Sequence, residues 1–336
     1  MNYLSPLLQS SYQHKLLEYQ LKVLVTGATG HLGNNLVREL IHQNYEVRVL
    51  CRLGSDITPI KNLDVEIVNG DITDLTSLET ACKGIETVFH MASYISLMPF
   101  EKKKLYSINV DGMENVIKAC KKQGNIELIY MSSIHAIPNS KNKYIGSYAE
   151  SKGIATKNLL NEIDSENIRG SVLYPTGLIG PNDFKISNIG KTIIAHSKKG
   201  TAAYVNGSYD FIDVRDVSKA TIELQKSHLN IKEVILSGNN QVSVKELLME
   251  LEKLTGISAP KIEAPIKFVE YYAHINGLIN KLVGRQAVIT GYAIKTLHSP
   301  IPNPASINNK NFIFCTRNWK HSIKDQYDWL KSNSYI

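Results

Sequence analysis

The sequence is poor in the patterns that mark several classes of protein. Its four cysteines have neither CxxC nor metal-ligand spacing, and no His, Cys and carboxylate set has such spacing. We therefore predict reduced thiols and no metal. No run approaches 18 uninterrupted apolar residues, so no transmembrane helix is predicted. With 21% charged and 43% hydrophobic residues in 336, the chain is expected to be a soluble, cytoplasmic globular protein.

The net charge of +7 is spread along the chain rather than concentrated. Its lysine clusters are short, as at 102–104, 121–122 and 198–199, and such clusters are typical of solvated helix faces. We expect no nucleic-acid partner, whereas a basic balance would suit an anionic cofactor. Residues 1–20 lack the basic start and long apolar centre of a signal peptide and are interpreted as an N-terminal extension.

Short β-branched runs alternate with helical segments from residue 21 onward. The runs lie at 21–26, 45–50, 65–70, 87–92, 127–132, 170–175 and 233–238. This alternation predicts a doubly wound α/β architecture, in which helices cover both faces of a parallel sheet. The alternation breaks after Pro181. We expect a sheet domain from 21–180 plus 209–239, and a smaller substrate-binding lid with a C-terminal helix from 181–208 plus 240–336.

Three glycines stand at the first predicted strand-to-helix turn, in VLVTGATGHLG. Gly27 would make the turn, Gly30 would allow a pyrophosphate to approach the backbone, and Gly33 would let helix and strand pack closely. The spacing is one residue longer than the commonest dinucleotide fingerprint, so the motif alone leaves a plain packing turn open. If the turn binds a dinucleotide, the residues that line it are Thr29, His31 and Leu32.

The ends of the next three strands offer further cofactor contacts. The second strand ends at Arg52 with no Asp or Glu, which favours NADP(H) over NAD(H), because an Arg accepts the 2′-phosphate of NADP. The alternative is a solvated surface Arg. Asp71 and Ile72 follow the third strand, where a carboxylate would meet the adenine amino group. Small residues after the fourth strand would let a ribose lie against the backbone, in the segment Met91, Ala92 and Ser93.

A serine, a tyrosine and a lysine suggest acid/base chemistry. Ser133 ends the fifth strand, and Tyr148 and Lys152 stand four apart in SYAESK. On a helix over 148–163 the ammonium would lie near the phenol and lower its pKa from about 10. Ser133 would hold the reacting oxygen, with Ser132 as the fallback. Because Y-x-x-x-K pairs are frequent by chance, this interpretation depends on the glycine turn and the strand ends.

Several motifs together resemble the extended short-chain dehydrogenase/reductase superfamily over residues 21–240. They are TGATGHLG, NGDITD, HMAS, YMSS, YAESK, LYPTGLIGPND and DFIDVRDVSKA. The resemblance implies a Rossmann-type NAD(P)-binding sheet, a nicotinamide cofactor and a catalytic set mapping onto Ser133, Tyr148 and Lys152, with Lys152 and Tyr148 also beside the cofactor. It further implies pairing of two copies through 104–122 and 148–163. Residues beside the nicotinamide ring would be Tyr174, Pro175 and Thr176.

Within the superfamily the sequence looks most like the dihydroflavonol-reductase-like and hydroxysteroid-dehydrogenase-like members. That likeness implies an NADP(H)-dependent oxidoreductase that reduces a carbonyl, or oxidises a secondary alcohol, of a small and partly hydrophobic substrate. The alternatives are a nucleotide-sugar epimerase or dehydratase with tightly bound NAD, and a non-catalytic NAD(P) sensor. Three departures count against the epimerases: HAIPN at 135–139, Thr176 in place of an Asn, and Tyr209 in place of the Arg that grips their diphosphate.

The loop between Ser133 and Tyr148 is shorter than in many relatives and covers less of the predicted site. Substrate contacts are therefore expected from 181–208 and 264–300. The aromatic-rich segment 267–284 is interpreted as lid core, with a membrane-touching surface as the alternative.

Overall fold

The computed structural model describes residues 20–96, 101–139, 141–227, 229–267, 307 and 312–336. Its centre is a seven-stranded sheet in which every neighbouring pair is parallel. In spatial order the strands are β11 (Glu233–Leu236), β6 (Arg169–Pro175), β5 (Glu127–Met131), β4 (Thr87–His90), β1 (Lys22–Thr26), β2 (Glu46–Cys51) and β3 (Glu66–Asn69). Each predicted run forms one of these strands, with ends moved by one or two residues, so the predicted doubly wound sheet is confirmed.

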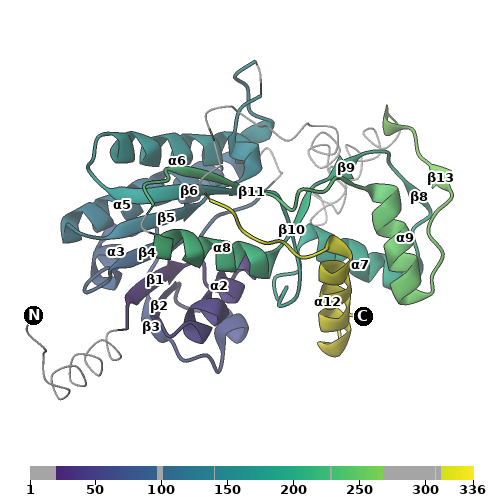
Figure 1. Cartoon of the computed structure of the whole chain (residues 1–336), viewed down its shortest axis with the longest axis horizontal. Coiled ribbons are helices and arrows are strands. Elements are labelled where there is room, and N and C mark those ends of the chain that lie inside the picture. Colours follow the sequence, from purple (N-terminus) through teal and green to yellow (C-terminus); the bar gives the residue numbers. More distant parts are fainter. Residues whose placement is uncertain (1–19, 97–100, 140, 228, 268–306, 308–311) are drawn as a thin grey trace, which may run out of the picture.

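Helices cover both faces of the sheet (Figure 1). Alternate residues of β1 explain why: Val23 and Val25 join one apolar cluster, and Leu24 joins the other. The first cluster is closed by α2 (His31–His42) and α8 (Val214–Ser227), and the second by α3 (Leu75–Ala81), α5 (Gly112–Gln123) and α6 (Gly146–Asp164). A strand buried on both faces must be apolar throughout, which is what made these runs visible in the sequence.

The chain leaves β1 toward β2 on one side and reaches β4 on the other. This reversal of strand order opens a crevice at the carboxyl ends of β1 and β4, where open α/β sheets bind ligands. Before α5, the short α4 (Lys102–Tyr106) runs into a π-helical turn, η3 (Ser107–Asp111). Short 3-10 turns follow β2 and β5, as η1 (Thr58–Ile60) and η4 (Ile134–Ala136).

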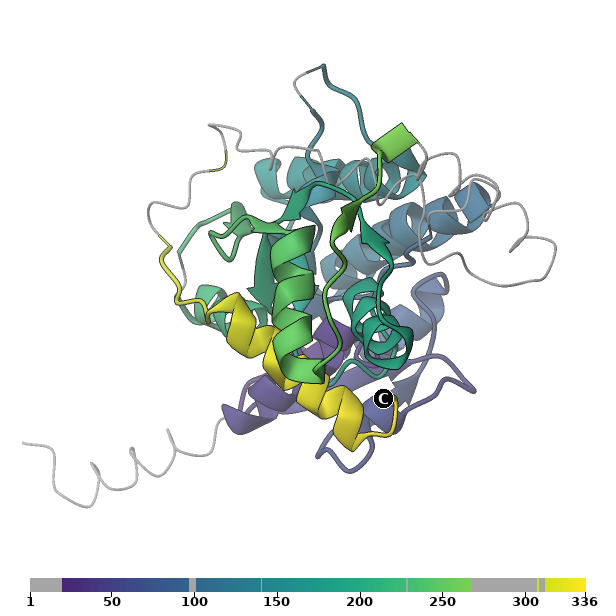
Figure 2. The same cartoon turned by 90° about the vertical axis from the view of Figure 1, so that its right-hand side faces the viewer.

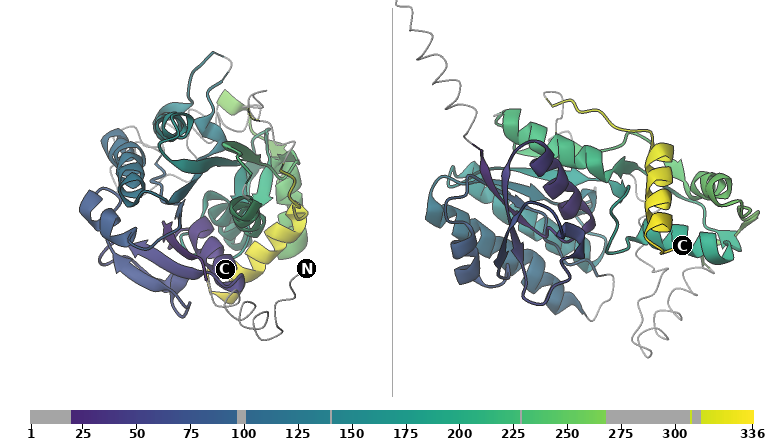
Figure 3. Two further views of the ribbon diagram at one scale, coloured as in Figure 1. Left: turned by 60° about the vertical axis from the view of Figure 1, so that its left-hand side comes forward. Right: turned by 90° about the horizontal axis from the view of Figure 1, so that it is seen from below.

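A smaller layer lies beyond the carboxyl ends of the strands (Figures 2 and 3). Its helices are α7 (Asn188–Lys199), α9 (Val244–Thr255) and α12 (Trp319–Ser332), packed around a third apolar cluster that includes Ile193, Leu251 and Ile323. Three separate strand pairs accompany these helices: β7 (Gly177–Ile179) with β10 (Phe211–Asp213), β9 (Ser208–Tyr209) with β12 (Val242–Ser243), and β8 (Ala203–Tyr204) with β13 (Ile262–Glu263).

Local capping fixes where two helices of this layer begin. Ser243 and Glu246 form a reciprocal capping box at the start of α9, and the Ser187 hydroxyl accepts a hydrogen bond from the Gly190 amide at the start of α7. The interpretation of 267–284 as lid core, and most of the substrate contacts expected at 264–300, lie outside the described residues. No helix in the described ranges is long and apolar enough to cross a bilayer.

Candidate active site

The glycine turn joins β1 to α2 at the centre of the carboxyl edge. Gly27 has φ 72°, and a Cβ there would lie 2.6 Å from the Ala92 amide nitrogen. A Cβ on Gly33 would lie 2.1 Å from the Gly27 carbonyl oxygen. Both positions therefore need glycine for the turn and for the contact of helix with strand.

Gly30 differs, since a Cβ there would meet only the Gly27 carbonyl oxygen, at 3.2 Å. It is the N-cap of α2, and no side chain caps that end of the helix. The first amides of α2 are thus available to an anion, with the helix dipole adding to the attraction. This uncapped helix end beside an open glycine fits a pyrophosphate, and the family's nicotinamide dinucleotide is the group that such a turn would hold.

Other predicted cofactor residues lie along the same edge. Arg52 is exposed just beyond β2. The Asp71 carboxylate, after β3, accepts hydrogen bonds from the amide and hydroxyl of Thr73, at 2.9 Å each. Ile72 and Leu32 are buried in the two apolar clusters, so their side chains pack rather than face the edge. Met91 and Ala92 follow β4, and the Ala92 amide donates to the Thr26 hydroxyl, 3.3 Å away.

The His31 side chain contacts the segment that follows β7, at Gly180 and Pro181. Its Nε2 lies 3.1 Å from the Gly180 carbonyl oxygen and 3.0 Å from that of Pro181. Its Nδ1 lies 3.8 Å from the buried Asp183 carboxylate. His31, at the start of α2, thus holds the segment around Gly180 and Pro181 against the glycine turn.

Ser133 and Ser132 have different surroundings. The Ser132 hydroxyl is buried and lies 2.6 Å from the Thr156 hydroxyl of α6. The Ser133 hydroxyl accepts a hydrogen bond from the His135 amide at 3.2 Å, and it is near enough to the Tyr148 phenol to lower the pKa of that phenol. Of the two serines, Ser133 therefore faces the tyrosine, whereas Ser132 ties β5 to α6.

The Tyr148 phenol lies near serine hydroxyls from two strand ends. Burial of the phenol raises the pKa of Tyr148, and the nearby hydroxyls of Ser133, after β5, and Ser93, after β4, lower it by less, so the net pKa is above the ordinary value. At neutral pH the phenol is protonated and able to donate.

Lys152 lies one turn beyond Tyr148 on α6 and is almost fully buried. Its ammonium donates to the Met131 carbonyl at 2.7 Å and lies 4.2 Å from the centre of the Tyr130 ring. Burial lowers the pKa of Lys152 to about 7. The expectation that this ammonium lowers the pKa of Tyr148 is wrong for this structure, because the lysine is directed to β5, is itself partly neutral near pH 7, and is outweighed by desolvation of the phenol.

The depressed pKa of Lys152 gives stability a specific pH dependence. Between about pH 7 and the unfolded pKa of 10.5 the unfolded chain binds more protons at this site, so the free energy of unfolding rises with pH. We expect Lys152→Met to be more stable than the wild type by a few kcal/mol near pH 6, with the gap shrinking toward pH 10. Urea unfolding across this range measures the gap; a gap independent of pH would contradict the assignment.

The residues predicted at the end of β6 have different surroundings. The Tyr174 ring is buried in the apolar cluster beneath α6, and its hydroxyl donates to Glu233 of β11. The Tyr174 side chain is thus packed in the core, and the contacts of Pro175 and Thr176 with a nicotinamide ring stay predictions. The buried Thr176 hydroxyl has no hydrogen-bond partner among the described residues. An orphaned hydroxyl at this edge fits a polar ligand group.

Two residues at this edge were not found from the sequence. Asn109, in the π-helical turn, hydrogen-bonds with the Tyr94 backbone at 2.8 and 3.0 Å and donates to the Ser151 hydroxyl at 3.0 Å. It thereby fixes the segment of Ser93 against α6. Lys185, from the segment before α7, donates to the Thr29 hydroxyl at 2.7 Å. No local pattern distinguishes either Asn109, which stands among other polar residues in YSINVDG, or Lys185.

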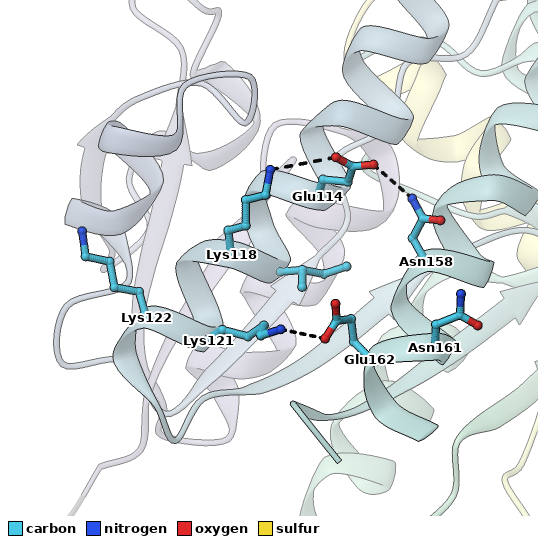
Figure 4. Close-up of a pocket in the computed structure, with 8 residues that line it drawn as sticks. Glu114, Lys118, Lys121, Lys122, Asn158, Asn161 and Glu162 are labelled. Atoms are coloured by element: carbon cyan, nitrogen blue, oxygen red, sulfur yellow. Dashed lines mark hydrogen bonds and ion pairs between the residues drawn. The ribbon is translucent and has the colours of Figure 1, made fainter. Parts of the chain in front are cut away.

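A groove of about 710 Å³ lies elsewhere, on the outer surface of α5 and α6 (Figure 4). Its charged side chains pair within the chain, as the 2.8 Å contact of Lys121 with Glu162 shows. The groove is lined by Glu114, Ile117, Lys118, Lys121, Lys122, Asn158, Asn161 and Glu162. None of the predicted catalytic or cofactor residues lines it.

The sheet, the uncapped glycine turn and the polar cluster at the strand ends define a dinucleotide-binding enzyme of the Rossmann type. The model of the NAD dependent epimerase/dehydratase family matches residues 23–234, and the protein belongs to this family, an extended group of NAD(P)-dependent short-chain dehydrogenases/reductases. The resemblance inferred from the motifs is thereby confirmed.

Named relatives of the chain include reductases and sterol dehydrogenases. A Synechocystis sp. protein provisionally named dihydroflavonol 4-reductase is 28% identical, covering 93% of this chain and 95% of its own. The Bos taurus sterol-4-alpha-carboxylate 3-dehydrogenase, decarboxylating, is 33% identical over 61% of this chain and 60% of its own.

Solved structures share the fold. The crystal structure of gox2253 has a TM-score of 0.79 at 24% identity, covering 95% of this chain and all of that one. The Thermus thermophilus UDP-glucose 4-epimerase, in complex with NAD, has a TM-score of 0.71 at 18% identity, covering 93% of this chain and 99% of that one. At these identities the likeness establishes the architecture alone.

Proposed function

We propose that the protein is an NADP(H)-dependent oxidoreductase that reduces the carbonyl group of a small, uncharged and partly hydrophobic substrate. The observation that carries the proposal is the convergence of the Ser133 and Ser93 hydroxyls on the Tyr148 phenol at the carboxyl edge. This is the edge that holds the glycine turn. An acid group and a hydrogen-bond donor would then face the same reacting oxygen.

Each residue has a separate part in the proposed reaction. Tyr148 donates its phenol proton to the carbonyl oxygen of the substrate, and Ser133 donates a hydrogen bond to the same oxygen. Lys152 holds the end of β5 against α6 through the Met131 carbonyl, which keeps serine and tyrosine in register. The nicotinamide, when bound, supplies the hydride. A raised pKa favours this reductive direction, since the acid must be protonated before it reacts.

The preference for NADP(H) is supported by the charge beyond β2. Arg52 is exposed there, and the adjoining sequence RLGS contains no acid that would bind a free 2′-hydroxyl. The adenosine end of the cofactor would lie between this arginine and the Asp71 turn.

The proposal is tested by incubating the purified protein with NADPH or NADH and a panel of ketones, aldehydes and hydroxysteroids. We expect cofactor-linked absorbance to change with NADPH and an uncharged carbonyl compound. Stable, tightly bound NAD together with conversion of a nucleotide sugar would instead support the epimerase alternative. Cofactor binding without any turnover would support the sensor.

The epimerase alternative is compatible with the architecture shared with the NAD-bound Thermus enzyme, but a shared architecture does not decide the function. Against it stands Tyr209, which packs toward Phe211 with ring centres 5.8 Å apart. An aromatic side chain cannot replace the bidentate grip of an arginine on a diphosphate.

We also propose that two copies pair through α5 and α6. Charges on this face are largely neutralised within the chain, as by Lys121 with Glu162 and Lys122 with Glu79 at 2.8 and 2.6 Å. Burying this face would leave few unpaired charges. Light scattering after gel filtration should give twice the mass of the chain; a monomer mass would refute the pairing.

A further inference from the structure

A lysine from the lid segment reaches the glycine turn across a large gap in the sequence. Lys185 lies three residues before α7, and its ammonium donates to the Thr29 hydroxyl at 2.7 Å. Much of the side chain is exposed, but its charged end is bonded to the glycine turn and is near enough to Arg52 and Cys51, at the end of β2, for their charges to affect its pKa. The proposed reduction uses neither this lysine nor its contact.

We propose that Lys185 is a specificity-determining residue, which together with Arg52 binds the phosphate on the adenosine ribose of NADP(H). The inference rests on the proposed NADP(H)-dependent function and adds to it a second cation, delivered by the lid segment. A phosphate dianion bound between a guanidinium and an ammonium makes charge-assisted hydrogen bonds with both.

The charges around Lys185 support an anion site. Burial and the nearby Arg52 guanidinium both lower the pKa of Lys185, whereas Asp56 and Cys51 raise it. All three neighbours belong to the end of β2 or the turn after it, which is where the adenosine ribose is read. The Asp56 carboxylate is engaged by the Thr58 amide at 2.9 Å. Within the described ranges neither Arg52 nor Lys185 forms an ion pair with an acidic side chain, although the Asp56 carboxylate is near enough to raise the pKa of Lys185.

The backbone that carries Lys185 is held from two sides. The side-chain amide of Asn34, on α2, donates a hydrogen bond to the Asn182 backbone carbonyl at 3.0 Å. The fully buried Asp183 carboxylate accepts hydrogen bonds from the Ser187 backbone N–H at 2.9 Å and from the Gln326 side chain, on α12, at 2.9 Å. Lys185 thus starts from a fixed point, and only its side chain has to turn from the Thr29 hydroxyl to a phosphate oxygen. A preorganised cation loses less entropy on binding.

Two nucleotides that differ only in the ribose phosphate test this role: adenosine 2′,5′-bisphosphate and 5′-AMP. We expect calorimetric titration of the full chain to show about tenfold weaker binding of the bisphosphate to Lys185→Gln and less than twofold change for 5′-AMP. Lys185→Arg should keep most of the affinity for the bisphosphate. The matched control Lys198→Gln removes an exposed charge near the end of α7 and should leave both affinities unchanged.

The outcomes separate this inference from the function on which it rests. Equal loss for both nucleotides, or no loss for the bisphosphate, would overturn the role of Lys185 while leaving the NADP(H) preference intact. A wild type that binds the bisphosphate no more tightly than 5′-AMP would overturn the preference itself, and the inference with it. Thermal unfolding of each variant shows whether an affinity change comes from misfolding.

Discussion

Replacing Tyr148 by Phe is expected to lower kcat about 1000-fold while changing the dissociation constant of NADPH less than twofold. The substitution removes only the phenol oxygen, so the ring still fills its site on α6. What is lost is the proton that the reacting carbonyl oxygen receives, together with the phenol oxygen that lies near the Ser133 and Ser93 hydroxyls. Turnover is measured by NADPH absorbance with a substrate found in the panel, and NADPH binding by calorimetry.

A second tyrosine provides the matched control. Tyr45 stands directly before β2, at the amino-terminal edge of the sheet and so opposite to the proposed site. It is buried, and its hydroxyl donates a hydrogen bond to Gln225 at 2.9 Å. Tyr45→Phe should therefore keep kcat, although it too removes a buried hydroxyl. If Tyr148→Phe retained more than about a tenth of the wild-type kcat, the acid role would be wrong.

The second large effect concerns the glycine turn. Gly33→Ala places a methyl group 2.1 Å from the Gly27 carbonyl oxygen. This oxygen belongs to the backbone, so no side chain can rotate to relieve the clash. Helix α2 must shift away from β1, at a cost of about 3 kcal/mol in the free energy of unfolding. The same shift displaces the first amides of α2, so NADPH binding should be lost as well. Chemical denaturation and calorimetry measure the two effects separately.

Gly30→Ala should separate binding from folding. Gly30 has φ −80° and ψ 169°, which alanine adopts without strain, and its Cβ would meet only one atom, at 3.2 Å. We expect less than about 1 kcal/mol of destabilisation, but at least tenfold weaker NADPH binding, because the methyl group would occupy the space of the pyrophosphate. Unchanged affinity in this variant would show that no dinucleotide approaches the backbone there.

The sheet was predictable because burial on both faces forces local composition. Val23, Leu24 and Val25 are all buried, and runs of this kind appear in the sequence without any knowledge of partners. The glycine turn was predictable for the same reason, since φ at Gly27 and packing at Gly33 are local requirements. Ser133 and Tyr148 could be placed because strand ends and a helix start fix their positions along one edge.

The remainder depends on contacts between distant segments. Lys185 reaches Thr29 over 156 residues, and no local pattern records that contact. The direction of the Lys152 ammonium was missed because helical spacing places a side chain on a face but does not choose among the acceptors there. The Met131 carbonyl competes for the ammonium at 2.7 Å. Likewise, the strand pattern around Tyr174 did not show which face its ring would occupy.

The layer beyond the strand ends is assembled from two stretches on either side of β11 of the central sheet: α7 comes before this strand, and α9 and α12 come after it. Gln326 of α12 is bonded to Asp183, close to the residues fastened by His31. A chimera that borrowed another enzyme's substrate preference would therefore need several coordinated crossovers. A single exchange within this region would remove the hydrogen bond between Gln326 and Asp183. Such an exchange would therefore alter nucleotide binding as well as substrate binding.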